Sequence, residues 1–184
     1  TVEWIRRIKS LGTKVEMITN GTILVERKAR ELIDAGLDML WISIDGATPE
    51  TYADVRLGAE LPQIIANLER LVRLRKKGHF PQPEIGIAFV AMKRNIQDLP
   101  KIIQLGKRLK VKHFSVSNLQ APTEDLQQER LYTKTVRSVA YLAGPQLPRL
   151  SLPKMDFDET TRDVLFQVFN SGVNIHFAGN AWSG

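Results

Sequence analysis

Two spacings of hydrophobic residues alternate along most of the chain. Residues 2–8 carry apolar side chains at helical spacing, whereas residues 15–19 form a short apolar run that ends at a turn, Asn20-Gly21. The same alternation continues as far as Asn118. It predicts helices and strands in turn, with helices over about 25–35, 48–56, 61–78 and 98–109, and strands over 39–44, 84–90 and 112–117.

The pattern changes after Asn118. Residues 120–153 are richer in glutamine, threonine and proline, and we expect a helix over about 124–142 followed by a loop that contains several prolines. The remaining apolar residues predict a helix that ends at Gly172 and a last strand over 173–177.

Strands that alternate with helices predict an α/β fold in which the strands are parallel. The spacing alone leaves two architectures open, a TIM-like barrel and an open doubly wound sheet. In both, ligands bind at the carboxyl ends of the strands. We expect that edge to carry Asn20, Ser43, Asp45, residues 92–95 and residues 117–119.

The composition is that of a folded domain. Of the 184 residues, 43% are apolar and 25% are charged, which excludes global disorder. The chain contains no cysteine, so disulfide bonds, thiolate zinc sites and a cysteine nucleophile are excluded within it. Its three histidines follow no metal-ligand spacing, and we expect no metal site from them.

The net charge of +6 permits an anionic partner without requiring one. The basic clusters within 70–77 and 107–112 lie at predicted helix ends, where cations complement the helix dipole, and no aromatic residues interleave with them. We therefore expect no nucleic-acid partner. No apolar run approaches the ~20 residues that span a bilayer, and no secretory signal is visible. These observations favour a cytoplasmic protein without a membrane partner.

The strongest chemical signal is the pair Ser43 and Asp45 at a predicted strand end. Strand alternation puts both side chains on one side, where a hydroxyl and a carboxylate can bind a polyhydroxyl group such as a ribose. Asp45 could equally cap the turn that leads to Thr48. Arg56 could bind a carboxylate through two nitrogens, or it could be an exposed residue at a helix end. Asn20 could contact a ligand, or it could stabilise the turn in which it stands.

Four segments, in this order, resemble a radical S-adenosylmethionine (SAM) enzyme. The match covers about residues 1–120, and its most specific part contains Ile42-Ser43-Ile44-Asp45-Gly46 and ends at Arg56. The matching segments are 18–22, 32–56, 90–100 and 116–119. The chain is most similar to the SPASM-type members, which carry a cysteine-rich C-terminal extension and modify peptides, proteins or peptide-derived cofactors.

The resemblance implies a partial (β/α)6 TIM-like barrel of parallel strands that lacks the first strands. It also implies a parent oxidoreductase or maturase, in which a [4Fe–4S] cluster cleaves SAM to a radical that abstracts hydrogen from a peptide, protein or cofactor-precursor substrate. The implied SAM-binding residues are Asn20, Ser43, Asp45, Arg56 and Asn118, with Ser43 and Asp45 near the ribose and Arg56 at the methionine carboxylate. No catalytic residue and no metal ligand is assigned.

The sequence departs from this family because its C-x-x-x-C-x-x-C loop and glycine-rich motif are missing. Both would lie before Thr1, and the cysteine-rich extension would lie after Gly184. We therefore expect a fragment, with residues 1–120 as the barrel core and residues 121–184 as a continuation and linker. We expect it to retain neither SAM nor a cluster and to be inactive alone. Its open barrel could self-associate.

Two other functions stay open at this point. A cluster-free barrel relative could act as a binding or scaffold protein, and the flanking coding sequence would separate this alternative from the enzyme fragment. An ordinary TIM-barrel lyase or isomerase is less well supported, because the sequence offers no obvious base such as a lysine at a strand end.

Overall fold

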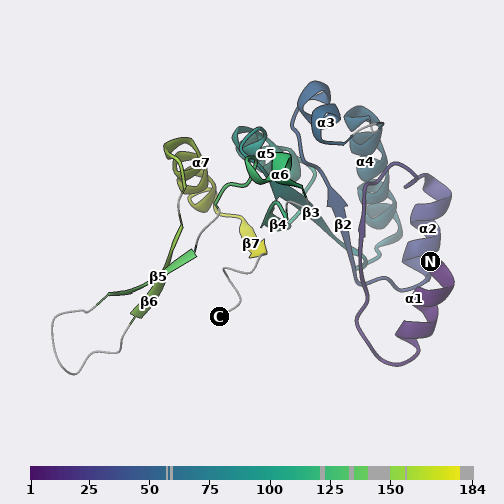
Figure 1. Ribbon diagram of the computed structural model, residues 1–184. Coiled ribbons are helices and arrows are strands. Elements are labelled where there is room, and N and C mark those ends of the chain that lie inside the picture. Colours follow the sequence, from purple (N-terminus) through teal and green to yellow (C-terminus); the bar gives the residue numbers. More distant parts are fainter. Residues whose placement is uncertain are drawn as a thin grey trace.

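The computed structural model describes residues 1–56, 58, 60–120, 123–132, 135–140, 150–155 and 157–178. Helices and strands alternate as predicted over the first 118 residues (Figure 1). The helices are α1 (Val2–Lys9), α2 (Glu26–Asp34), α3 (Pro49–Val55), α4 (Leu61–Gly78), η1 (Ile96–Asp98, a 3-10 turn), α5 (Leu99–Arg108), α6 (Glu124–Gln127) and α7 (Glu159–Phe169). The strands are β1 (Glu16–Thr19), β2 (Met39–Ser43), β3 (Glu84–Ala91), β4 (His113–Asn118), β5 (Thr135–Ala140), β6 (Leu150–Met155) and β7 (Asn174–Ala178).

The main sheet contains five strands in the order β1-β2-β3-β4-β7, and every pair is parallel. Neighbouring strands are joined through helices, which confirms the predicted α/β class. Because the strands are parallel, their carboxyl ends meet at one edge of the sheet, and Asp45 follows β2 at that edge. The strands of the sheet lie side by side in their chain order, with β1 and β7 at the two ends, which is the order of a (β/α) barrel and not of a doubly wound sheet.

One face of the sheet packs against helices and forms the core. Alternate residues of β2, β3 and β4 are buried there, which is why these strands are so apolar in sequence. The helices contribute the apolar stripes that their spacing predicted. The fully buried side chains of this core include Leu32, Leu40, Ile42, Ile64, Leu68, Leu71 and Ile87.

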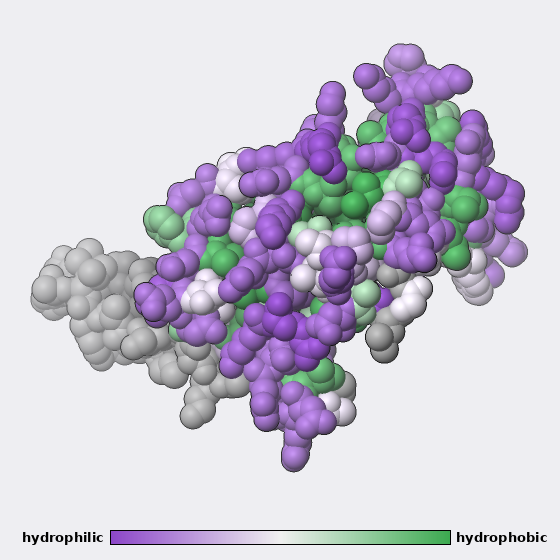
Figure 2. Space-filling view, turned by 90° about the horizontal axis from the view of Figure 1, so that it is seen from above, coloured by the Kyte–Doolittle hydropathy of each residue, from purple (hydrophilic) through white to green (hydrophobic). Residues whose placement is uncertain are grey.

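The opposite face of the sheet is partly open. Trp41 and His113 lie on either side of Gly86 in the strand register, and their rings meet edge-on with centroids 6.5 Å apart. A Cβ at Gly86 would lie 2.3 Å from the Trp41 ring, so this approach requires glycine. Ile18 on β1 remains 68% exposed. Seen from above, hydrophobic residues show mainly in the middle of the molecule, with hydrophilic residues around them (Figure 2).

The prediction of a helix over residues 124–142 is wrong. Among the described residues of this range, 124–132 and 135–140, only Glu124–Gln127 is helical, and Thr135–Ala140 forms β5, which pairs antiparallel with β6 in a separate two-stranded sheet. The sequence of β5 contains Thr135, Val136 and Val139, and such β-branched residues favour strands. The pairing joins segments ten or more residues apart, so local periodicity does not reveal it. The part of the expected helix over 141–142 lies outside the described residues.

Asp38 ties four segments together at the amino ends of the strands. Its carboxylate accepts hydrogen bonds from Lys9 Nζ at 2.8 and 2.9 Å, from the Val15 backbone N–H at 2.7 Å and from Gln82 Nε2 at 3.1 Å. These bonds, with the Lys9 bond foremost, hold the pKa of Asp38 below its ordinary value. Since Lys9 ends α1, this carboxylate fastens α1 to the sheet.

Replacing Asp38 with asparagine should lower the free energy of unfolding by about 1–2 kcal/mol at neutral pH. The hydrogen bonds to its carboxylate lower the pKa of Asp38 in the folded protein. The stabilisation that they provide is therefore complete above the pKa of Asp38 in the unfolded chain, about 3.9, and it is lost as the pH falls through the folded pKa. Urea unfolding of both proteins between pH 7 and pH 3 measures this. The difference in stability between them should narrow at acid pH, and a constant difference would contradict the assignment.

Candidate functional site

The centre of the candidate site is Asp45, directly beyond β2 at the carboxyl edge of the sheet. Its side chain is 1% exposed. Oδ1 accepts a hydrogen bond of 2.7 Å from the Val90 backbone N–H on β3, and Oδ2 accepts one of 2.6 Å from Arg56 Nε. Arg56 Nη2 also lies 2.6 Å from Oδ2. The carboxylate thus joins the ends of β2 and β3 and holds one cation.

Arg56 is brought to this carboxylate by the short helix α3. Thr48 caps the helix, because its hydroxyl accepts from the Thr51 N–H and Thr51 Oγ1 in turn accepts from the Thr48 N–H. Pro49 occupies the first turn, where its missing N–H costs nothing. Arg56 is the C-cap residue, so the length of α3 fixes its position.

The guanidinium of Arg56 is only partly used by Asp45. Its side chain is 31% exposed, and Nη1 has no hydrogen-bond partner among the described residues. A guanidinium offers its donors in a planar fork, and one edge here is held by Asp45. The remaining edge has the chemistry to bind an anionic group such as a carboxylate.

Gly46 and Tyr52 pack the loop after Asp45 against α3. A Cβ at Gly46 would lie 2.3 Å from the Tyr52 backbone nitrogen, so only glycine allows this approach. Tyr52 is fully buried and its hydroxyl donates to the Ser43 carbonyl at 3.4 Å. Burial raises the pKa of Tyr52 above its ordinary value, which keeps the hydroxyl protonated. Ser43 itself is buried at the end of β2, two residues before Asp45.

Asn95 and Asp98 also hold this loop, a role that the sequence analysis did not predict. Asn95 is 2% exposed; its Nδ2 donates to the carbonyls of Asp45 and Val90 at 3.0 Å, and its Oδ1 accepts from the Met92 N–H at 2.8 Å. Asp98 accepts from the Ala47 N–H at 2.9 Å. Asn95 belongs to the segment expected at the strand edge, but its bond to the Asp45 carbonyl, 50 positions away, has no local signal in the sequence.

Asn20 lies after β1, and its side chain stabilises the turn in which it stands. Its Oδ1 accepts from the Thr22 N–H at 3.2 Å and from Thr22 Oγ1 at 2.8 Å, and its side chain is exposed. The turn is held from α4 by Asn67, which donates to the Gly21 carbonyl at 2.9 Å and the Thr22 carbonyl at 3.1 Å. Asn20 forms no direct bond with Asp45 or Arg56.

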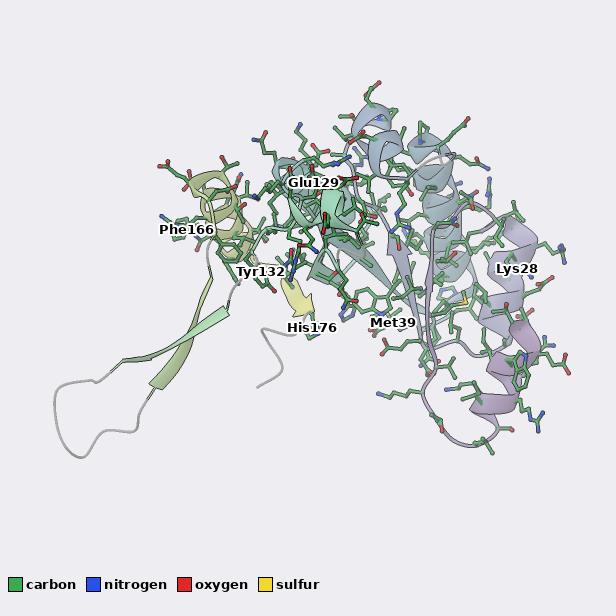
Figure 3. The ribbon with its side chains drawn as sticks, in the orientation of Figure 1. Lys28, Met39, Glu129, Tyr132, Phe166 and His176 are labelled. Carbon is green, nitrogen blue, oxygen red and sulfur yellow. The ribbon has the colours of Figure 1, made fainter. Side chains whose placement is uncertain are left out.

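Asn118 lies at the end of β4, and its side chain binds the following segment. Its Oδ1 accepts from the Leu131 N–H and its Nδ2 donates to the Tyr132 carbonyl, both at 3.1 Å. Figure 3 shows Tyr132 and Glu129 on this segment. Of the five residues predicted to bind a cofactor, the structure joins Asp45 directly to Arg56 and places Ser43 beside them. Asn20 and Asn118 each stabilise a separate loop at the same edge.

The chain does not fit an iron–sulfur cluster held by thiolates, because it contains no cysteine. Within the described residues, no group of three histidine, aspartate or glutamate side chains could hold a metal ion. His113 pairs with Glu84 at 2.8 Å near the start of its strand, away from the carboxyl edge. The described residues also include no helix that is long and apolar enough to cross a membrane.

Comparison with known proteins identifies the family. Residues 1–106 match the family model described as the Radical SAM superfamily, and the chain belongs to this superfamily. The match includes Ser43, Asp45 and Arg56. The family resemblance is therefore confirmed, and members of this superfamily use SAM together with a [4Fe–4S] cluster.

The curated relatives include enzymes that modify peptides and cofactors. The chain is 29% identical over 136 residues to the tungsten-containing aldehyde ferredoxin oxidoreductase cofactor-modifying protein of Pyrococcus furiosus, covering 73% of this chain and 38% of the relative. It is 30% identical over 119 residues to the PqqA peptide cyclase of Rhizobium meliloti, covering 65% and 30%. The chain therefore spans about a third of the length of these relatives.

Solved structures confirm the fold. SuiB of Streptococcus suis, solved bound to the precursor peptide SuiA, aligns with a TM-score of 0.62 and 12% sequence identity over 97% of this chain and 35% of SuiB. The structure of SuiB bound to S-adenosylmethionine aligns with a TM-score of 0.60 over 96% of this chain. At this identity the comparison supports the partial barrel and not a shared substrate.

Proposed function

We propose that the chain is the SAM-positioning part of a longer radical SAM oxidoreductase. When bound, the [4Fe–4S] cluster of such an enzyme supplies the electron that cleaves SAM, and the resulting radical abstracts a hydrogen atom from the substrate. The observation that supports this role is the Asp45–Arg56 pair at the carboxyl edge of a sheet whose sequence matches the superfamily.

Arg56 is the residue proposed to bind the methionine carboxylate of SAM. Its Nε and Nη2 are held by Asp45, and the remaining edge of the guanidinium is available for a second carboxylate. Asp45 fixes the guanidinium, and together with Ser43 it is proposed to lie beside the ribose, because both residues stand at the carboxyl end of β2. Asn20 and Asn118 complete the proposed SAM edge by shaping the loops after β1 and β4.

The proposed substrate is a peptide, a protein or a cofactor precursor. One relative is named as a cofactor-modifying protein and another as a peptide cyclase, and SuiB was solved with a precursor peptide. The cluster ligands would come from a part of the longer protein outside this chain, because the chain has no thiol. In this proposal residues 1–120 form the barrel core, and residues 121–184 continue the barrel with α7 and β7 and link it to a further domain.

Formation of 5′-deoxyadenosine from SAM tests the enzymatic proposal. The intact protein, with its cluster reconstituted and reduced under anaerobic conditions, should convert SAM to 5′-deoxyadenosine, measured by chromatography. The matched control is the same protein without reductant, which should form none. An intact protein that binds SAM but forms no product after reconstitution would instead support a binding or scaffold role.

A further inference from the structure

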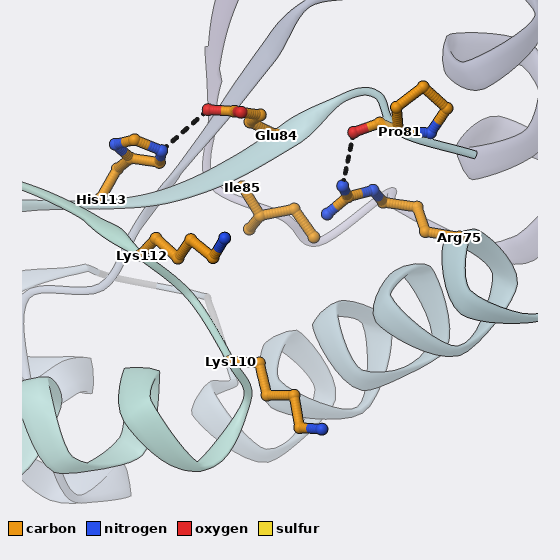
Figure 4. A pocket seen from close by; sticks show the side chains of 7 residues that line it. All are labelled: Arg75, Pro81, Glu84, Ile85, Lys110, Lys112 and His113. Atoms are coloured by element: carbon orange, nitrogen blue, oxygen red, sulfur yellow. Dashed lines mark hydrogen bonds and ion pairs between the residues drawn. The ribbon is translucent and has the colours of Figure 1, made fainter. Parts of the chain in front are cut away.

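A basic pocket lies at the opposite edge of the sheet, where β3 and β4 begin (Figure 4). It has a volume of about 240 Å³. Arg75 reaches it from the last turn of α4, and Lys110 and Lys112 reach it from the connection between α5 and β4. Glu84 and His113 form another part of its wall. Three cations thus line one cavity, one from α4 and two from the connection between α5 and β4.

Arg75 is held in the pocket by a backbone carbonyl and forms no ion pair with a carboxylate within the described residues. Its Nη2 donates to the Pro81 carbonyl at 2.7 Å, which fixes the guanidinium. Its Nε is buried and has no hydrogen-bond partner among the described residues. Burial lowers the pKa of Arg75, and the charge of Glu84 opposes this change. The guanidinium is held in one orientation, and its Nη1, which forms no hydrogen bond with the described residues, can donate to an oxyanion.

The two lysines add charge that the pocket does not neutralise. Neither Lys110 nor Lys112 forms an ion pair within the described part of the chain. Lys110 adopts φ +58°, the left-handed conformation that favours glycine after a helix, and it lines the pocket beside Lys112. The carboxylate of Glu84 is engaged by His113 at 2.8 Å.

We propose that this pocket binds the phosphate group of a small phosphorylated ligand. Three cations face one carboxylate that is already paired, and this balance matches a dianionic phosphate better than a single carboxylate. The volume of about 240 Å³ leaves space for a part of the ligand beyond the phosphate. The pocket lies at the amino ends of the strands, so this site is separate from the SAM edge and does not rest on the proposed function.

Titration calorimetry on the intact protein tests this site, with inorganic phosphate, phenyl phosphate and acetate as probes. Both phosphates should bind saturably, and acetate should bind at least about tenfold more weakly. Arg75→Gln and Lys112→Gln should each raise the dissociation constant for phosphate about tenfold or more. Tighter binding of phenyl phosphate would identify an organic phosphate as the ligand, and equal binding would identify free phosphate.

Arg73→Gln and Lys76→Gln are the matched controls, because both remove an exposed cation of α4 that does not line the pocket. They should change phosphate affinity by less than about twofold. Equal weakening in all four variants would show attraction to net charge only and would overturn the proposal. Absence of saturable phosphate binding to the unmodified protein would overturn it as well. Lys112→Gln changes an exposed side chain, so it keeps the test valid if Arg75→Gln fails to fold.

Discussion

Replacing Arg56 with alanine should lower the free energy of unfolding by about 3–5 kcal/mol. Asp45 is 1% exposed and Arg56 supplies the cation that contacts it, at 2.6 Å. Removing that cation leaves a buried carboxylate with the Val90 N–H as its remaining partner. The cost of keeping an unpaired charge away from water makes up most of the loss in the free energy of unfolding, because the other contacts of Asp45 are unchanged. Urea unfolding of the intact protein at neutral pH measures the loss.

The double variant Asp45→Asn/Arg56→Ala separates this cause from a simple loss of packing. It should be more stable than Arg56→Ala, because the buried charge is gone and the asparagine Oδ1 can still accept from Val90. Asp45→Asn alone should cost about 1.5–3 kcal/mol, since Arg56 is 31% exposed and water can solvate it. If Arg56→Ala and the double variant are equally unstable, the buried-charge explanation fails.

Arg56→Lys should raise the dissociation constant for SAM about tenfold or more while most of the stability remains. A lysine keeps the positive charge beside Asp45 but offers one ammonium group in place of a planar fork. It cannot hold Asp45 with one edge and a second carboxylate with the other, as the guanidinium can. Losing a charge-assisted bond of about 1.5–3 kcal/mol corresponds to this change in affinity.

Equilibrium dialysis of SAM with the intact protein measures this effect. Arg73→Lys is the matched control, because Arg73 is exposed on α4 and away from the carboxyl edge. It should leave the affinity for SAM unchanged. An Arg56→Lys protein that is stable and binds SAM as tightly as the original would remove Arg56 from the proposed site.

The sequence was sufficient for the main sheet because its elements are defined locally. The strand before Asp45 is apolar on both sides, and Thr48 with Pro49 marks the start of α3, so each element could be placed without its neighbours. The order of these elements then requires parallel strands. The β5–β6 sheet was missed because it depends on pairing between separate segments rather than on periodicity.

The sequence predicted which residues lie at the site but not the hydrogen bonds that join them. Strand alternation placed Ser43 and Asp45 together, and the family resemblance added Arg56. The direct bond between Asp45 and Arg56 depends on how α3 folds back over the end of β2. The spacing of residues in the sequence does not predict this arrangement. The bond from Asn95 to the Asp45 carbonyl has the same origin in long-range packing. Roles of these residues in binding SAM stay predictions.

Hydrogen–deuterium exchange of the intact protein, with and without SAM, tests the central claim most directly. The claim is that the carboxyl edge formed by β2, α3 and β3 holds SAM. Peptides that contain residues 40–56 and 90–96 should exchange more slowly when SAM is present, whereas peptides over 76–84 and 107–113 at the opposite edge should not change. Protection confined to 76–84 and 107–113, with none over 40–56, would contradict the account.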